Sequence, residues 1–269
     1  MSKTKSKVDL KPFNKYYYYE KAVQNPENEV EFFNEKYEEI RGKEPKTLRE
    51  DFCGTGAISC EWVKQGEEYQ SWGIDLDPEP IEYGKEFHLG SLDKEEQKRV
   101  HYILDDVMKA QTPKTDVIFA FNFSYFIFKK RSELIKYFTS VKNSLKDDGV
   151  FFIDLFGGPD SQTVMTDEIK HPGFKYFWDC QYFNAINNDC RFAIHFKRKG
   201  EKKRKDVFVY EWRMWGMREL RDILEEVGFS QTIGYWEGED EDGDGDGNFF
   251  ECEDADNCDA WVTYIAAIK

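Results

Sequence analysis

The 269 residues of the chain suffice for one large α/β domain, or for one domain with an insertion, and 40% hydrophobic residues supply an ample core. The net charge of −15 at pH 7 argues against general affinity for nucleic acid, because contacts to phosphate need local positive charge. No apolar run approaches the roughly 18–20 residues of a membrane span, and the six scattered cysteines form no C-x-x-C pair, so we expect a cytoplasmic protein with reduced thiols.

The first 45 residues are expected to form a tail and a helical cap. Residues 1–12 contain Lys, Ser and Thr with few apolar groups, which is typical of a disordered tail. Residues 13–45 combine four consecutive tyrosines with apolar residues at helical spacing, which predicts one or two helices that end near Gly42. Four adjacent tyrosines cannot all face one core, so they either cover a pocket in part or pack on the edge of a sheet.

The segment 46–77 predicts a strand, a glycine turn, a helix and a second strand that ends in a carboxylate. Gly54 and Gly56 break the first strand, and without a Cβ they let a ligand approach the backbone closely. The helix that follows directs its free N–H groups to the same place. Asp75 follows about twenty residues later, at a strand tip where a carboxylate can accept both hydroxyls of a ribose. The segment therefore predicts a site for an adenosine-type ligand.

Further strands alternate with helices up to residue 158, which predicts a parallel sheet with right-handed crossovers. The expected strands cover residues 100–104, 116–122 and 149–155. In an open parallel sheet the ligand crevice lies beyond the carboxyl ends of the strands, so polar residues at these ends should line one cleft. The residues in question are Glu50, Asp51, Asp75, Asp106, Asn122 and Asp154.

Between residues 159 and 215 the chain alternates aromatic and polar residues, which predicts a small antiparallel sheet. The basic run 197–205 within it is either a solvated hairpin tip or an anion contact at the mouth of the site. A helix at 217–227 and strands at 232–236 and 261–268 complete the chain. The expected fold is α/β: a doubly wound, seven-stranded, mostly parallel sheet with an antiparallel insertion after strand five and N-terminal covering helices.

The sequence Glu50-Asp51-Phe52-Cys53-Gly54-Thr55-Gly56 resembles the acidic-x-Gly-x-Gly-x-Gly motif of the class I S-adenosylmethionine-dependent methyltransferases, small-molecule type. Phe52 replaces the first glycine of that motif, so the chain is expected to enter the turn differently. The resemblance covers 46–158 and 216–269 as the catalytic domain and leaves 159–215 as a substrate-covering insertion. A last strand that returns as a hairpin also fits this family.

The resemblance implies S-adenosylmethionine as cofactor and assigns residues to it. Asp75 would bind the ribose, Asp106 would lie near the adenine amine with Val107 against the ring, and Asn122 matches the fourth motif. Glu50 and Asp51 could exchange roles in the first motif. The complete predicted donor site is Tyr18, Tyr19, Glu50, Asp51, Cys53, Gly54, Gly56, Asp75, Leu76, Asp106, Val107 and Asn122.

The implied reaction is transfer of a methyl group to an N, O or S atom of a small polar metabolite, catalysed mainly by positioning. If the acceptor needs a general base, Asp154 and His195 are the candidates for this catalytic role. Aromatic side chains could wall the acceptor site or belong to the core, and Arg213 could anchor a carboxylate or phosphate or form a salt bridge within the insertion. The predicted substrate-binding residues are Phe123, Tyr125, Trp178, Trp212, Arg213 and Trp215.

The acidic loop from Asp240 to Glu251 fits the D-x-D-x-D-G-x5-E pattern of calcium loops. It is a weak calcium site, a solvated hairpin or a substrate-facing lid, and no metal is expected in the active site. Two other functions stay open: a non-catalytic S-adenosylmethionine-binding or interaction protein, and a methyltransferase that acts on protein substrates.

Overall fold

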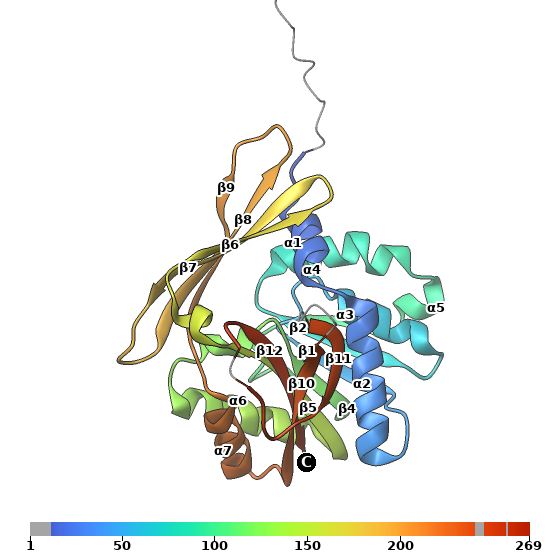
Figure 1. Cartoon of the computed structure of the whole chain (residues 1–269). Helices are drawn as coiled ribbons and strands as arrows, with labels where there is room; N and C mark the ends of the chain where they lie inside the picture. Colours follow the sequence, from blue (N-terminus) through green and yellow to red (C-terminus); the bar gives the residue numbers. More distant parts are fainter. Residues whose placement is uncertain (1–11, 240–244, 257) are drawn as a thin grey trace, which may run out of the picture.

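The computed structural model describes residues 12–239, 245–256 and 258–269, and two β-sheets organise this part of the chain (Figure 1). In the described residues the larger sheet has eight strands, in the order β11-β10-β12-β5-β4-β1-β2-β3. Strands β1 to β5 run parallel, whereas β12 lies antiparallel between β5 and β10. Its strands are β1 (Thr47–Asp51), β2 (Gln70–Asp75), β3 (Val100–Leu104), β4 (Thr115–Ala120), β5 (Leu145–Gly157), β10 (Gln231–Glu239), β11 (Gly245–Glu251) and β12 (Trp261–Ile268).

Helices cover both faces of this sheet, because alternate side chains of its central strands point to opposite sides. Val117 and Phe119 of β4 belong to a core that α2 and α3 cover, whereas Ile118 and Ala120 belong to a core beneath α6 and α7. All of β4 is buried, as its apolar run from Val117 to Ala120 predicts. The helices are α1 (Lys15–Val23), α2 (Pro26–Arg41), α3 (Ala57–Trp62), α4 (Pro78–Phe87), α5 (Lys94–Gln97), α6 (Arg131–Ser144) and α7 (Met217–Val227).

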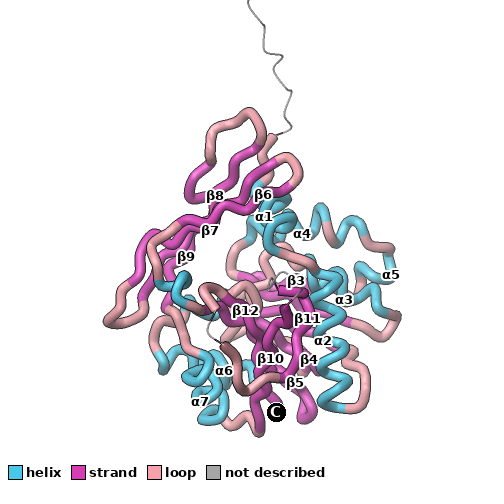
Figure 2. The backbone as a smooth tube through the Cα atoms, in the orientation of Figure 1, coloured by secondary structure: helices cyan, strands magenta, loops and turns pink. Residues whose placement is uncertain are grey.

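A second, antiparallel sheet leaves the main sheet after β5 and returns before α7 (Figure 2). It consists of β6 (Thr166–His171), β7 (Phe174–Phe183), β8 (Asp189–Arg198) and β9 (Arg204–Arg213). The short helix α1 lies between this insertion and the main body: Tyr18 packs edge-on against Phe174 of β7, and Tyr16 packs against Tyr83 of α4. The predicted fold, a doubly wound and mostly parallel sheet with an antiparallel insertion, is confirmed.

The sequence analysis expected seven strands in the main sheet, and the additional strand is β11. Residues 245–251, expected to be part of an acidic loop, pair antiparallel with β10. Phe249 explains why this glycine-rich segment is ordered on the sheet, since its ring lies 4.4 Å from that of Tyr264 and 6.0 Å from that of Phe32. No helix in the described part of the chain is long and apolar enough to cross a membrane.

Candidate active site

The turn from β1 to α3 has a left-handed backbone at three positions: Phe52 (φ 59°), Gly54 (φ 53°) and Gly56 (φ 65°). Residues with a Cβ rarely adopt this conformation, which costs roughly 1–2 kcal/mol. The ring of Phe52 packs against Phe128 and Tyr137, with centroid distances of 6.2 and 5.7 Å. This packing offsets the backbone cost. The phenylalanine therefore takes the conformation that glycine favours at the same place.

The two glycines of the turn have different reasons to be glycine. A Cβ on Gly54 would meet no atom within 4 Å, so this position faces open space. A Cβ on Gly56 would lie 2.5 Å from the ring of Tyr102, whose hydroxyl donates to the carbonyl of Thr55 at 2.8 Å. Sequence reasoning treated both as sites of close approach by a ligand. Of the two, Gly54 has the open space that such an approach needs, whereas Gly56 packs against Tyr102.

The two acids at the end of β1 have separate environments. Glu50 accepts hydrogen bonds from the N–H and the hydroxyl of Ser59, and burial raises its pKa to about 8. Asp51 accepts from Nε of Arg49 at 2.7 Å and from the hydroxyl of Tyr137 at 2.9 Å. Both partners of the Arg49–Asp51 ion pair are completely buried. Each acid therefore accepts two hydrogen bonds in the interior, Asp51 from two side chains and Glu50 from Ser59 alone.

Asp75, at the end of the neighbouring strand β2, holds the β1–α3 turn in place. One carboxylate oxygen accepts from the N–H of Gly54 at 2.8 Å, and the other accepts from the N–H of Asp77, also at 2.8 Å. Burial raises the pKa of this carboxyl, while these N–H groups oppose the increase. Each carboxylate oxygen has two acceptor positions, so Asp75 can still accept from hydroxyl groups of a ligand.

These groups line a cavity of about 300 Å³ that we call the donor cavity. Its walls come from the β1–α3 turn, from α1 and from the ends of β2 and β4. Of the residues predicted to bind the donor, those lining it are Tyr19, Glu50, Asp51, Cys53, Gly54, Asp75 and Asn122. Sequence reasoning missed lining residues that arrive from α1 and β9, among them Lys15, Tyr16, Gln24, Phe208 and Tyr210.

Five predicted donor residues lie outside this cavity. Tyr18 packs against the insertion, and Gly56 faces Tyr102. Asp106 accepts from the N–H of Met108 and pairs with Lys109, which lowers the pKa of its carboxyl. Val107 is buried.

Leu76, the fifth of these residues, is 68% exposed and belongs to an open apolar shelf. It follows β2 directly, and Leu104, which pairs with Asp75 at the end of β3, is 58% exposed. Met108 is also an exposed apolar residue, four positions further along the chain. Large apolar side chains at neighbouring strand ends provide a surface for a flat ring.

Helix α1 is fastened over the donor cavity by polar contacts. Glu20 accepts from the hydroxyl of Thr55 at 2.8 Å, and the same oxygen lies 2.6 Å from Nε2 of His88. Lys15 at the start of the helix pairs with Glu79 at 2.8 Å. These contacts join α1 to the β1–α3 turn and to α4.

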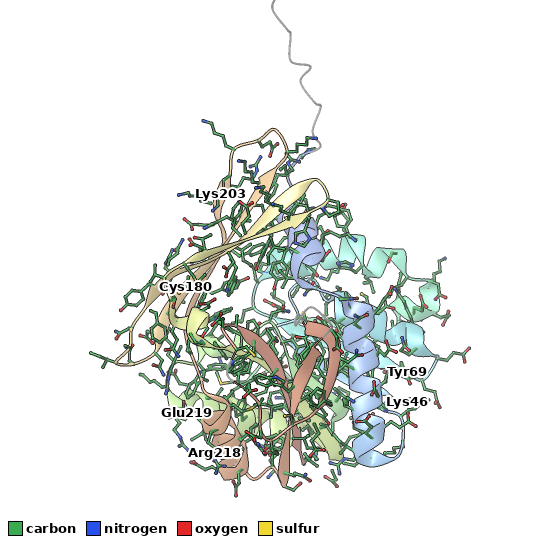
Figure 3. All side chains as sticks on the ribbon, in the orientation of Figure 1. Lys46, Tyr69, Cys180, Lys203, Arg218 and Glu219 are labelled. Carbon is green, nitrogen blue, oxygen red and sulfur yellow. The ribbon has the colours of Figure 1, made fainter. Side chains whose placement is uncertain are left out.

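A second cavity, of about 450 Å³, lies between the insertion and the carboxyl ends of the main sheet, and we call it the acceptor cavity. Its walls are mainly aromatic. The ring of Trp178 stacks on Phe192 at 4.8 Å, and the ring of Tyr210 stacks on Trp212 at 4.3 Å. Cys180, on β7, is a further lining residue (Figure 3). Three of the predicted substrate residues line this cavity, namely Phe123, Trp178 and Trp212.

The other three predicted substrate residues have different positions. Tyr125 is buried and donates its hydroxyl to the carbonyl of Asp154. Arg213 donates to the carbonyl of Lys129 and pairs with Glu219 at 3.0 Å, and its guanidinium lies 3.7 Å from the ring centroid of Trp215. Arg213 is therefore engaged outside the acceptor cavity, which corrects the expectation that it anchors an anionic substrate. The basic run 197–205 lines neither cavity, and Lys203 lies at the far end of the insertion (Figure 3).

The donor and acceptor cavities meet at three residues that line both of them: Tyr19, Asn122 and Tyr210. The hydroxyls of Tyr19 and Tyr210 lie near each other, and burial raises the pKa of each. Each tyrosine therefore keeps its proton at neutral pH and can donate or accept a hydrogen bond. The side chains come from α1, from the end of β4 and from β9, so only the folded chain brings them together.

Asp154 supports this junction from behind. Its carboxylate accepts from the N–H of Asn122 at 2.6 Å and from that of Phe123 at 2.9 Å, and it lines neither cavity. Both of these residues have a left-handed backbone, with φ of 57°. Burial raises the pKa of Asp154 to about 8. The observed contacts fit a positioning role better than the predicted role of a general base in contact with substrate.

The structure also places His195 away from the chemistry. The neighbouring residues of β8, Phe192 and Ile194, line the acceptor cavity, so His195 points to the opposite face of the sheet. Its Nε2 contacts Asp179 at 2.9 Å, and its Nδ1 accepts from the N–H of Asp206 at 2.8 Å. Both ring nitrogens are thus occupied, which corrects the expectation of a catalytic histidine.

Asp154→Asn is expected to lower the thermal unfolding temperature more at pH 5 than at pH 8. An asparagine can offer only one acceptor oxygen to the two N–H groups, at a cost of about 1–3 kcal/mol. The carboxyl pKa is raised by folding, so its contribution to stability is present at low pH and is lost as the pH rises through about 8. Asp147→Asn, at a side chain that is 99% exposed, is the matched control. An equal loss at both pH values would contradict this account.

The predicted calcium loop lies only partly in the described structure. Residues 240–244, with Asp240, Asp242 and Asp244, fall outside the described residues. Residues 245–251 are extended, and Glu251 pairs with Tyr235 in the sheet. Within the described ranges, no group of three or more His, Cys, Asp or Glu side chains could hold a metal ion.

The donor cavity has features that fit S-adenosylmethionine. The side-chain oxygen of Gln24, which lines the cavity, is buried without a hydrogen-bond partner among the described residues, so it can accept from an ammonium group. Asp75 can accept ribose hydroxyls, and Gly54 leaves space for close approach. The shelf of Leu76 and Leu104 offers apolar contact to an adenine. Residues of this chain thus match the amino-acid, ribose and base portions of the molecule.

Comparison with known proteins relates this geometry to a family. A family model described as a methyltransferase domain matches residues 51–153. Comparison with curated protein sequences finds no match. A solved structure of an S-adenosylmethionine-dependent methyltransferase from Clostridium acetobutylicum is similar over 94% of this chain and 96% of that chain, with a TM-score of 0.67 and 18% identity.

Two further solved structures share the fold. An amino pentose methyltransferase from Micromonospora echinaspora has a TM-score of 0.64 and 14% identity, and the match covers 97% of this chain and 99% of that chain. A sugar N-methyltransferase from Streptoalloteichus has a TM-score of 0.61 and 14% identity, over 99% of this chain and 97% of that chain. The chain thus contains a methyltransferase domain over residues 51–153 and has the fold of the class I S-adenosylmethionine-dependent methyltransferases.

Proposed function

We propose that the chain methylates an N, O or S atom of a small molecule held in the acceptor cavity. The observation that carries this proposal is that the two cavities meet at Tyr19, Asn122 and Tyr210. A methyl group presented from the donor side would face an acceptor atom at this junction. Two of the similar structures are described as methyltransferases of amino pentose and sugar nitrogen, which supports a small acceptor and favours nitrogen.

In this reaction the residues of the chain act mainly by positioning. Bound S-adenosylmethionine supplies a methyl group that is already activated on a cationic sulfur. With the donor bound, the acceptor lone pair would form a bond to the methyl carbon while the carbon–sulfur bond would break, leaving its electrons on sulfur. Tyr19, Tyr210 and Asn122 can hold the acceptor about 3 Å from this carbon and in line with the leaving sulfur. The aromatic walls exclude water from the junction.

The shape of the acceptor cavity favours a small molecule over a protein substrate. The cavity holds about 450 Å³ between two sheets, within the usual range of small-molecule pockets. Its aromatic lining also revises the expectation of a purely polar metabolite, because such walls favour an acceptor with an apolar part. A non-catalytic donor-binding protein would have no need for a second cavity joined to the first.

The test is a methylation screen with S-adenosylmethionine and the metabolite extract of the source cells, read by mass. We expect one or more small metabolites to gain 14 mass units, the difference between a methyl group and a hydrogen. Methyl transfer should require the acceptor cavity, so a variant that fills it gives the decisive comparison. Val262, an exposed residue that lines the cavity, is a suitable position.

Val262→Trp is expected to lower turnover by about tenfold or more, equivalent to roughly 1.4 kcal/mol, while S-adenosylhomocysteine binds as before. Val209→Trp is the matched control, because Val209 is equally exposed on β9 but lines neither cavity. Turnover and calorimetric affinity are measured on the same preparations. Donor binding without methylation of any extract component would favour the non-catalytic alternative.

A further inference from the structure

We infer that the acceptor cavity selects amines carried on an apolar ring or chain and rejects acceptors that bear a carboxylate or a phosphate. The inference rests on the proposed function, since it concerns the acceptor of the same cavity. The inference narrows the acceptor atom from N, O or S to nitrogen, and it predicts that the substrate carries a positive charge. Three properties of the cavity support this inference: its aromatic walls, the unpaired carboxylates in its lining, and the absence of lysine, arginine and histidine from the described lining.

The walls attract cations as well as apolar groups. Trp178 and Phe192 form one stacked pair across β7 and β8, and Tyr210 and Trp212 form another along β9. The face of an aromatic ring carries partial negative charge, so an ammonium group over it gains about 0.5–2 kcal/mol. The same rings contact the apolar body of a ligand. Two such surfaces in one cavity suit a molecule with an amine at one end.

Three carboxylates from different elements line the cavity, and each is at least partly exposed to solvent. Asp160 follows β5, Asp167 lies on β6 and Glu237 lies on β10, and all three line the cavity. None of them pairs with a lysine, arginine or histidine among the described residues. Burial raises the pKa of Asp167, and the nearby charge of Asp160 raises it further. Unpaired negative charge along the lining of a cavity raises the local concentration of cations.

The lining that the structure describes includes no lysine, arginine or histidine. Two basic residues adjacent in sequence to the lining are engaged elsewhere: Arg213 with Glu219, and His195 with Asp179. An acceptor carboxylate or phosphate would lose water in the cavity without gaining a cationic partner, which costs several kcal/mol. The cavity therefore discriminates against anions in two ways: its described lining has no basic side chain, and it contains three carboxylates.

The junction residues suit the amine at the moment of transfer. The hydroxyls of Tyr19 and Tyr210 and the amide of Asn122 can accept from the N–H groups of a neutral amine. The amine approaches the cavity as a cation and gives one proton to bulk water before it reaches the junction. Its lone pair then forms the bond to the methyl carbon, the carbon–sulfur bond breaks with its electrons on sulfur, and the product leaves as a methylated ammonium ion.

The test uses three probes with one aromatic body and different end groups: 2-phenylethylamine, 2-phenylethanol and 3-phenylpropionate. Binding to the full chain saturated with S-adenosylhomocysteine is measured by calorimetry and by ligand-observed NMR. We expect the amine to bind about tenfold more tightly than the alcohol, and the carboxylate not to bind. Binding of the carboxylate at least as tightly as the amine, or no binding of the amine, would overturn the inference.

Charge variants locate the effect in the cavity. The double variant Asp167→Asn and Glu237→Gln is expected to weaken binding of the amine about threefold to tenfold and to leave the alcohol unchanged. Glu168→Gln is the matched control, because Glu168 is next to Asp167 on β6 but does not line the cavity. Equal effects of the double variant on amine and alcohol would contradict the assignment.

Failure of this inference is distinguishable from failure of the proposed function. If Val262→Trp blocks methylation of a neutral or anionic acceptor, the acceptor cavity is the site of transfer and only its preference for amines is wrong. If Val262→Trp leaves methylation of every acceptor unchanged, the cavity is not the site and the proposed function fails with it.

Discussion

Gly54→Val is expected to lower the affinity for S-adenosylmethionine by about a hundredfold or more, equivalent to roughly 3 kcal/mol, while the protein stays folded. A Cβ at this position meets no protein atom within 4 Å, so the added side chain projects into the donor cavity. The left-handed backbone (φ 53°) adds a stability cost of about 1–2 kcal/mol. Calorimetric titration with S-adenosylhomocysteine gives the affinity, and thermal unfolding gives the stability.

Gly56→Val is the informative comparison, because this variant should lose stability rather than donor affinity alone. Its Cβ would overlap the ring of Tyr102, which is held by its hydrogen bond to the carbonyl of Thr55. Steric overlap and the left-handed backbone together should cost about 3–5 kcal/mol of stability. If Gly54→Val binds the donor like the wild type, the β1–α3 turn is not where the donor lies.

Arg49→Met is expected to lower the free energy of unfolding by about 3–5 kcal/mol, the typical cost of breaking a buried ion pair. Arg49 is completely buried and donates to Asp51, to the carbonyl of Val107 and to the hydroxyl of Ser144. Without the guanidinium, Asp51 remains in the interior with only the hydroxyl of Tyr137 as a side-chain donor. Burial already raises the pKa of this carboxyl against the opposing effect of Arg49. Urea unfolding of both proteins measures the difference.

Two further variants show whether the cost arises from the unpaired charge. The double variant Arg49→Met and Asp51→Leu removes both charges and should recover part of the loss. Arg218→Met breaks an exposed pair with Asp222 on α7 and should change stability by less than about 0.5 kcal/mol (Figure 3). A double variant no more stable than the single one would show that packing, not charge, causes the loss.

The sequence predicted the parts of the site that depend on local order along the chain. Asp75 and Asn122 directly mark the ends of strands, and strand ends of a parallel sheet meet at one edge. Tyr210, Phe208 and Gln24 reach the donor cavity only because the insertion and α1 fold back over the sheet. No local pattern reports such long-range packing.

Two errors had signals in the sequence that were outweighed by other features. His195 alternates with Phe192 and Ile194 on its strand, and the period of two places it on the opposite face. The acidic composition around residue 245 suggested a loop, whereas Phe249 supplies the apolar contact that adds β11 to the sheet. In both cases the residue type suggested one structure, whereas the spacing of the neighbouring apolar residues indicated the one observed.

The tyrosine run illustrates how helix geometry distributes similar side chains. Successive residues of a helix turn by about 100°, so Tyr16, Tyr18 and Tyr19 face different partners. Tyr16 contacts α4, Tyr18 contacts the insertion and Tyr19 reaches the junction of the cavities. The expectation that four tyrosines cannot share one core agrees with this arrangement, while the choice of Tyr19 over Tyr18 required the structure.

The attachment of α1 has a consequence for the residence time of ligands. A helix of nine residues is marginal by itself, so its order depends on its contacts with the body of the protein. A ligand in the donor cavity adds contacts to the inner side of α1, and by linkage its binding and the docking of the helix strengthen each other. The dissociation rate of the spent donor is therefore tied to the contacts of Glu20 with Thr55 and His88, none of which is a bond to the ligand itself.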